Sequence, residues 1–302
     1  MAMRPSDPTW AWVLGTGRCG STLVHEVLAR HPDVGFMSNL EDRLPLAGWT
    51  SRFSPACYRW VPERFTTKGR LRFAPSEGYR LLDRAVSPAL STPCRDLGAA
   101  DADPWLAGRL RGLFEARATA QGRPVFLHKF TGWPRAGLLE AVFPGSRFVH
   151  VVRDGRAVAA SWLQMGWWLG HRGPEGWPWG PLPPDYQDEY EASGRNFAVL
   201  AGIAWKLLLD AFEVARHDLG GRWLDVRYED VVADPRACFA DIAGFLGLAW
   251  DGRFERAVAR YEFRTGAVDA YRRHLDPTTL DLLDTSLAGH LERWGYAAMA
   301  RR

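Results

Sequence analysis

The sequence predicts an α/β fold in which helices cover both faces of a central parallel β-sheet. Two observations lead to this fold class. Short apolar segments alternate with longer segments of helical periodicity, which is typical of strand–helix–strand units. The first apolar segment also runs into a glycine-rich turn followed by a helix, and this is the arrangement of a phosphate-binding loop. Both observations favour strands that are buried beneath helices on either side.

The first half of the chain is expected to supply three strands. Residues 10–14 form the first, which breaks at Gly15, and a helix then spans residues 21–30. Residues 35–100 are rich in Pro, Arg, Ser and aromatic residues, so an irregular insertion is expected there. The segments that follow are a helix at 104–120 ended by Gly122, a strand at 124–128, a helix at 133–143 and a strand at 147–152.

The second half is expected to add one strand and several helices. After a helix at 154–164, residues 166–186 hold too many Trp, Pro and Gly residues for regular structure. The later segments are a long helix at 186–217, a strand at 222–227, and helices at 234–246, 252–261 and 277–291. No repeat or composition shift divides the chain, so one domain over residues 1–302 is predicted.

Composition excludes several classes of protein. A hydrophobic content of 47% with 15 Trp residues indicates a folded globular protein, and a net charge of +3 without charge runs argues against nucleic acid as a partner. The four cysteines show no metal or disulfide spacing, so we expect no metal site and a reducing, cytoplasmic location. We also expect no membrane span, because no apolar run approaches about 18 residues.

The glycine-rich turn lacks the lysine of a nucleoside-triphosphate loop. Its spacing, Gly15 to Gly20-Ser21-Thr22, nearly fits that loop, but Ser21 stands where the lysine is usual. The positive charge is supplied from within the turn by Arg18. We therefore expect the loop to bind an anion other than ATP.

Polar residues follow four of the predicted strands. The first group is the glycine-rich turn, and the second is His128-Lys129. The remaining groups are Arg153-Asp154-Gly155-Arg156, which leads to Ser161, and Tyr228-Glu229-Asp230. Since the carboxyl ends of parallel strands meet at one edge of a sheet, these residues are expected to share a crevice.

These blocks resemble the sulfotransferases that use 3′-phosphoadenosine 5′-phosphosulfate (PAPS). Arg18-Cys19-Gly20-Ser21-Thr22 is similar to their 5′-phosphosulfate loop, and Arg153 to Ser161 has the spacing of their 3′-phosphate motif. The segment from Tyr228 to Pro235 resembles a third recurrent block. The three blocks occur in the family's order. The resemblance implies a P-loop-like three-layer sandwich and an enzyme that moves a sulfuryl group from PAPS to a hydroxyl.

The resemblance also implies roles for individual residues. Arg18 and the backbone N–H groups of residues 19–22 would hold the 5′-phosphate and the sulfuryl group, and Lys129 occupies the position of the family's catalytic lysine. Arg153 and Ser161 would hold the 3′-phosphate, and Tyr228 would touch the adenine. The segment Phe263-Arg264-Thr265-Gly266 matches the family's last element only partly, so Arg272 and Arg273 are alternative 3′-phosphate contacts. No metal is required.

The general base and the acceptor are less well defined. A glutamate shortly after the His-Pro-Asp-Val stretch at residues 31–34 is the base in some members, which makes Glu41 the first candidate, His128 the second and Asp42 the third. The acceptor is expected to be a small-molecule, sugar or lipid hydroxyl. Trp residues beyond Ser161 form either an acceptor wall or simple packing. A P-loop kinase and a non-catalytic nucleotide- or anion-binding module are the alternative functions, and no oligomeric state is predicted.

Overall fold

A five-stranded parallel sheet forms the centre of the computed structural model, which describes residues 7–44, 50–60, 73–264 and 268–296. The strand order is β2-β3-β1-β4-β5, and every pairing is parallel. The strands are β1 (Thr9–Gly15), β2 (Val34–Phe36), β3 (Val125–Thr131), β4 (Arg147–Val152) and β5 (Trp223–Arg227). The fold class predicted from the sequence is confirmed.

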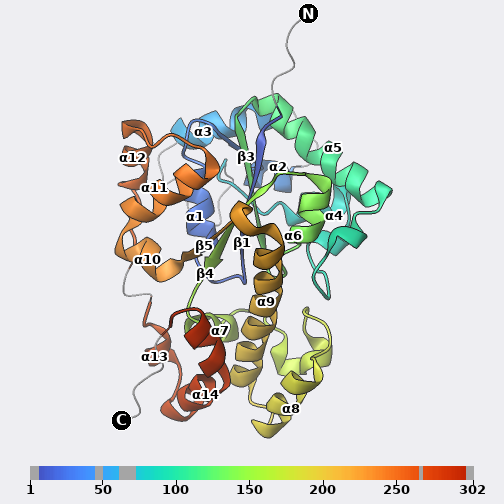
Figure 1. The fold of residues 1–302 in the computed structure, drawn as a ribbon, viewed down its shortest axis with the longest axis vertical. Helices are drawn as coiled ribbons and strands as arrows, with labels where there is room; N and C mark the ends of the chain where they lie inside the picture. The colour runs from blue at the N-terminus through green and yellow to red at the C-terminus, as the bar shows by residue number, and fades with distance from the viewer. Residues whose placement is uncertain (1–6, 45–49, 61–72, 265–267, 297–302) are drawn as a thin grey trace, which may run out of the picture.

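Alternate residues of each strand enter two separate hydrophobic cores. In β1, Trp10, Trp12 and Leu14 join one core, whereas Ala11 and Val13 join the other. Helices α5 (Pro104–Gln121), α6 (Ala136–Val142) and α9 (Phe197–Leu219) cover the first face. Helices α1 (Ser21–Leu28), α11 (Pro235–Leu246) and α12 (Gly252–Val258) cover the second, giving the expected three layers (Figure 1).

The chain changes direction across the sheet beside the central strand β1. The chain leaves β1 towards the β2 edge, and the connection from β3 to β4 later crosses β1 to the opposite edge. Ligands of open parallel sheets bind at such a reversal, beyond the carboxyl ends of the strands. Helices α7 (Gly155–Leu163), α13 (Tyr271–His274) and α14 (Pro277–Arg293) lie at this end, in the lower half of Figure 1.

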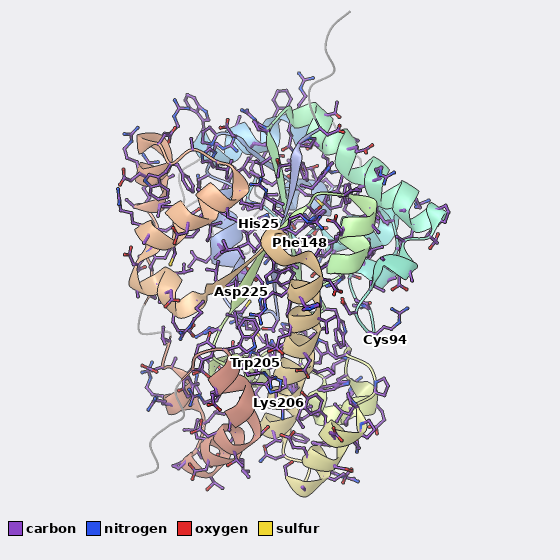
Figure 2. The ribbon with its side chains drawn as sticks, in the orientation of Figure 1. His25, Cys94, Phe148, Trp205, Lys206 and Asp225 are labelled. Carbon is purple, nitrogen blue, oxygen red and sulfur yellow. The ribbon has the colours of Figure 1, made fainter. Side chains whose placement is uncertain are left out.

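Helix α7 is held close to α9 by a glycine. A Cβ atom on Gly155 would lie 2.6 Å from Cε3 of Trp205, so only glycine allows this approach. Next to Trp205, Lys206 pairs with Glu189 of α8 (Pro184–Ala192) at 2.5 Å. Figure 2 labels Trp205 and Lys206, which lie along α9. The Gly155–Trp205 contact sets the position of α7, which carries Ser161, and the Lys206–Glu189 pair joins α8 to α9.

Several elements differ from the sequence prediction. The described parts of residues 35–100 contain part of the edge strand β2 and helices α2 (Asn39–Arg43), α3 (Ser54–Trp60) and α4 (Tyr79–Ala85), which are too short to show a periodic pattern. The long helix expected at 186–217 is instead α8 and α9, because Gly194 and Arg195 take positive φ angles and Asn196 caps α9. Helix α10 (Tyr228–Ala233) and α13 were not foreseen as separate helices.

Within the described residues, no helix is both long and apolar enough to cross a membrane.

Candidate active site

The turn after β1 is shaped to expose backbone N–H groups. Gly17, Arg18 and Gly20 have φ angles of 82°, 57° and 94°, all in the left-handed region. Helix α1 begins at once with Ser21, and no described side chain caps its N-terminus. A turn of this kind at a helix N-terminus is suited to binding an anion through its backbone N–H groups.

Close packing around the turn requires two of its glycines. A Cβ atom on Gly15 would lie 2.4 Å from Cys19 Sγ, and one on Gly20 would lie 2.2 Å from Cδ2 of Tyr228. Cys19 is fully buried, so its thiol fills space beneath the turn. Tyr228 is also largely buried, and its ring contacts the turn directly. Any larger residue at either glycine would force the loop to move.

The segments after β1, β4 and β5 meet at this turn. Arg18 donates from Nε to Oγ of Ser161 at 2.8 Å, which joins the two predicted phosphate motifs. A guanidinium nitrogen of Arg153 donates to the Arg18 carbonyl at 3.1 Å, and the Arg153 guanidinium lies 4.7 Å from the centre of the Tyr228 ring. The structure therefore brings together four of the predicted site residues.

Lys129 enters the same site from β3. Its Nζ atom donates to Thr22 Oγ1 at 2.7 Å and forms an ion pair with Glu77 Oε1, also at 2.7 Å. Lys129 was expected just past a strand, but it lies within β3, which runs to Thr131. Glu77 was not among the predicted site residues. The sequence around it, Pro-Ser-Glu-Gly, carries no signal that would have distinguished it from a surface turn.

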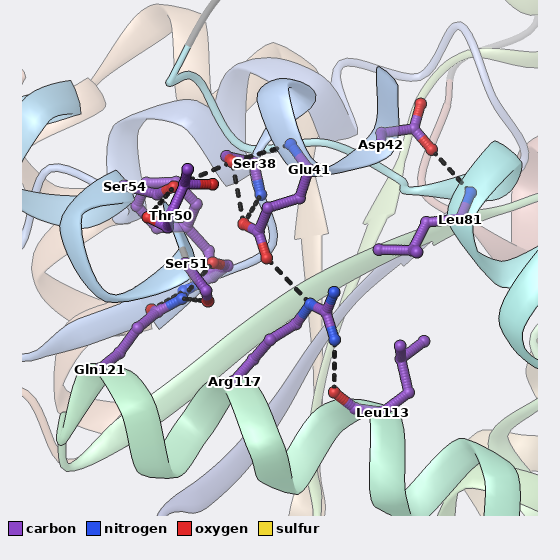
Figure 3. Close-up of polar contacts among 11 residues, drawn as sticks. Ser38, Glu41, Asp42, Thr50, Ser51, Ser54, Leu81, Leu113, Arg117 and Gln121 are labelled. Atoms are coloured by element: carbon purple, nitrogen blue, oxygen red, sulfur yellow. Dashed lines mark hydrogen bonds and ion pairs between the residues drawn. The ribbon is translucent and has the colours of Figure 1, made fainter. Parts of the chain in front are cut away.

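The structure places Glu41 in a buried structural network away from this turn. Its carboxylate accepts from the backbone N–H and hydroxyl of Ser38 at 3.0 and 2.9 Å, and its other oxygen pairs with Arg117 Nε at 2.9 Å (Figure 3). Asp42 accepts from the Leu81 N–H at 3.0 Å. Glu41 and Asp42, the first and third candidates for the base, therefore both bond to neighbouring elements, and their role as base stays a prediction. The Ser-x-x-Glu spacing was a readable capping box.

His128 also points away from the site. Because side chains alternate along a strand, His128 faces α5 while Lys129 faces the turn. Its ring lies 4.9 Å from Phe114 and 4.8 Å from Phe130, and neither ring nitrogen has a hydrogen-bond partner among the described residues. Burial, reinforced by the charge on Lys129, lowers the His128 pKa to about 3. A buried residue in this position cannot reach an acceptor.

The remaining basic residues are of two kinds: one is buried in ion pairs, and two are exposed to solvent. Arg156, within the 3′-phosphate motif, is paired with Asp154 at 2.6 Å and Asp284 at 2.7 Å, which ties α7 to α14. Arg272 and Arg273 are exposed on α13. That helix rests on α7 through Tyr271, so both arginines are carried beside the helix of Ser161. Of the partly matching last element, Thr265 and Gly266 lie outside the described residues.

The Trp residues beyond Ser161 pack mainly against one another. Trp162, Trp168, Trp177 and Trp179 are buried, and the Trp162 ring stacks on both Trp168 and Trp179 with centroid distances of 5.9 and 5.0 Å. Trp167, by contrast, is half exposed. The cluster therefore belongs to the first hydrophobic core, to which the 166–186 segment contributes three of its Trp residues.

The chain also matches a known protein family. The chain matches the sulfotransferase family over residues 11–252, a span that contains the turn, Lys129, Arg153, Ser161 and Tyr228. It belongs to the sulfotransferase family. Membership establishes an enzyme that transfers a sulfuryl group and implies PAPS as the donor, as predicted. It also decides against the kinase and the non-catalytic module.

Solved structures share the fold of this sulfotransferase. The sulfotransferase domain of the Synechococcus PCC 7002 olefin synthase is 19% identical, with a TM-score of 0.51 and coverage of 94% of this chain and 98% of that one. STF9 from Mycobacterium avium is 14% identical, with a TM-score of 0.60 and coverage of 99% and 79%. The sulfotransferase domain from the curacin biosynthetic pathway is 13% identical, with a TM-score of 0.56 and coverage of 96% of this chain and 98% of that one. No curated protein matches the chain.

Proposed function

We propose that this sulfotransferase binds PAPS across the turn at residues 15–22 and the start of α7, and sulfates a hydroxyl of a small-molecule, sugar or lipid acceptor. The observation that carries the proposal is the contact between Arg18 and Ser161. Two motifs separated by more than a hundred residues would each hold one phosphate of the same nucleotide. Their direct contact supports a single ligand that spans both.

The residues at the turn fit this donor. The left-handed backbone and the uncapped start of α1 would hold the 5′-phosphate and sulfuryl oxygens, with Arg18 and Lys129 supplying positive charge. Arg153 and Ser161 would hold the 3′-phosphate, and Arg272 or Arg273 would add charge from α13. Tyr228 would contact the adenine. When bound, PAPS would supply the sulfuryl group.

The chain's own groups would supply most of the catalysis through position and charge. Sulfuryl transfer, like phosphoryl transfer, requires that negative charge on the departing phosphate be stabilised. Lys129 is suited to this because its side chain is only 5% exposed and its ammonium group already donates to the Thr22 hydroxyl. Arg18 would clamp the same phosphate from the opposite end of the turn.

Ligand-induced thermal stabilisation tests the proposal. Adenosine 3′,5′-bisphosphate at about a hundred times its dissociation constant should add about 2.7 kcal/mol, or a rise in Tm of about 5 °C. Arg18→Met should abolish that rise. Arg109→Met, which alters an exposed arginine on α5, serves as the matched control and should preserve it.

A second ligand distinguishes the alternative. Magnesium-ATP at the same concentration should give a much smaller rise in Tm, because ATP carries no 3′-phosphate for Arg153 and Ser161. Stabilisation by magnesium-ATP without any by the bisphosphate would refute the proposal. A screen of hydroxyl compounds with PAPS as donor would then identify the acceptor.

A further inference from the structure

We propose that Glu77 is the general base that takes the proton from the acceptor hydroxyl, an inference that rests on the proposed function. Glu77 Oε1 lies 2.7 Å from Lys129 Nζ, and the same Nζ lies 2.7 Å from Thr22 Oγ1. One ammonium group therefore separates the carboxylate from the phosphate-binding turn. A base at this distance is close to the oxygen that must attack the sulfuryl group.

Glu77 is accessible in a way that the buried carboxylate of Glu41 is not. The Glu77 side chain is 28% exposed, whereas that of Glu41 is 1% exposed and engaged at both oxygens. A general base must come within hydrogen-bonding distance of its substrate. Among the carboxylates considered, Glu77 combines contact with the catalytic lysine and access from solvent.

The backbone holds Glu77 in a fixed position. Gly78, which follows it, has a φ of 65°, and a Cβ atom there would lie 2.2 Å from Met37 Sδ. The Ser76 N–H donates to the Met37 carbonyl at 2.8 Å, and the Gly78 N–H donates to Ser76 Oγ at 3.1 Å. Residues 76–78 are therefore held against Met37, in the segment after β2, on both sides of Glu77. A preorganised carboxylate needs little rearrangement before proton transfer.

The contacts of Glu77 place it beside the phosphate-binding turn at residues 15–22, on the side where Trp162 lies. Thr131 Oγ1 donates to Glu77 Oε1 at 3.4 Å. A Cβ atom on Gly17 would lie 3.9 Å from Thr131 Cβ and 3.8 Å from Trp162 Nε1, so these residues surround the turn together. Trp162 Nε1 is buried and has no hydrogen-bond partner among the described residues. These contacts place the Glu77 carboxylate beside Gly17 of the phosphate-binding turn, where an acceptor oxygen would approach the sulfuryl group.

The acceptor oxygen forms a bond to sulfur while the bond between sulfur and the 5′-phosphate oxygen breaks. The acceptor proton passes to Glu77, and the electron pair of the breaking bond stays on the departing phosphate. Lys129 carries positive charge between the two sites. It stabilises the phosphate as the neighbouring carboxylate becomes neutral.

Water serves as the acceptor in the test, since it needs the same proton removal. Formation of adenosine 3′,5′-bisphosphate from PAPS is measured without added acceptor for wild type, Glu77→Gln and the exposed control Glu115→Gln. Glu77→Gln should lower kcat about 100-fold or more, and the control should leave it unchanged. The dissociation constant for the bisphosphate, measured by calorimetry, should change less than threefold.

A second variant separates a base from a group that only positions Lys129. Turnover by Glu77→Ala should be restored by added carboxylates in the order of their basicity, with acetate more effective than formate. Wild-type turnover in Glu77→Gln, or rescue by chloride equal to that by acetate, would overturn the assignment. Loss of bisphosphate binding in Glu77→Gln would also overturn it. If wild type itself neither binds the bisphosphate nor consumes PAPS, the proposed function fails instead.

Discussion

Replacing Glu41 with glutamine should destabilise the protein and leave its chemistry intact. The Glu41–Arg117 pair is buried, with side-chain exposures of 1% and 10% (Figure 3). Glutamine keeps an oxygen for Ser38 but leaves the Arg117 cation without its counter-charge. Removing one partner of a buried pair costs about 3–5 kcal/mol. For a chain of 302 residues that corresponds to a fall in Tm of about 5–8 °C.

The assay combines unfolding with turnover below the transition. Trp fluorescence reports unfolding, and PAPS consumption at about 15 °C reports activity while both proteins remain folded. The double variant Glu41→Gln/Arg117→Met, which removes both charges, should recover part of the lost stability. Unchanged Tm together with lost turnover in Glu41→Gln would refute the reasoning. It would restore Glu41 as the base that the sequence suggested.

Two further predictions concern β3. Lys129→Met should lower kcat about 100-fold or more, because it removes the charge that faces the departing phosphate; turnover within threefold of wild type would contradict this. His128→Phe should retain turnover and make the protein more resistant to acid. Burial holds the His128 pKa at about 3 against an ordinary value of 6.5, so only the unfolded chain gains a proton as pH falls through 6.5, and stability is lost towards pH 3. That loss is about 2 kcal/mol at pH 5. Urea unfolding at pH 7 and pH 5 should therefore give a loss about 2 kcal/mol smaller in the variant than in wild type, and the loss that remains comes in part from His25 and His150, whose pKa values burial also lowers.

Elements with regular hydrophobic patterns could be predicted from the sequence, and those defined by single turns could not. The buried strands β1 and β4 and helices α5 and α11 were located within a few residues, since each is a continuous apolar or periodic segment with clear end signals. Strand β2 has three residues and pairs only with β3. Its position depends on a parallel neighbour that follows 89 residues later, between Phe36 and Val125. No local pattern encodes such a pairing.

The donor half of the site was readable because each of its motifs is local. Arg18 to Thr22 and Arg153 to Ser161 are contiguous segments, and parallel topology alone predicts that they meet. The contact between Arg18 and Ser161 follows from that rule. Glu41 is different, because its Ser-x-x-Glu spacing is also that of a capping box, and the structure shows that box. Its role as the base stays a prediction.

The acceptor half depends on contacts that cross between distant segments. Glu77 reaches the site only because the turn at Ser76–Gly78 is fixed against Met37, which follows β2, while Lys129 projects from the next strand of the sheet. The alternation of β3 sends Lys129 to the turn and His128 to the core. A one-residue shift of register would exchange them. The chemistry at this site therefore depends on the register of β3 in the sheet. His128→Phe tests the residue on its core face, and Lys129→Met tests the residue on the face towards the phosphate-binding turn.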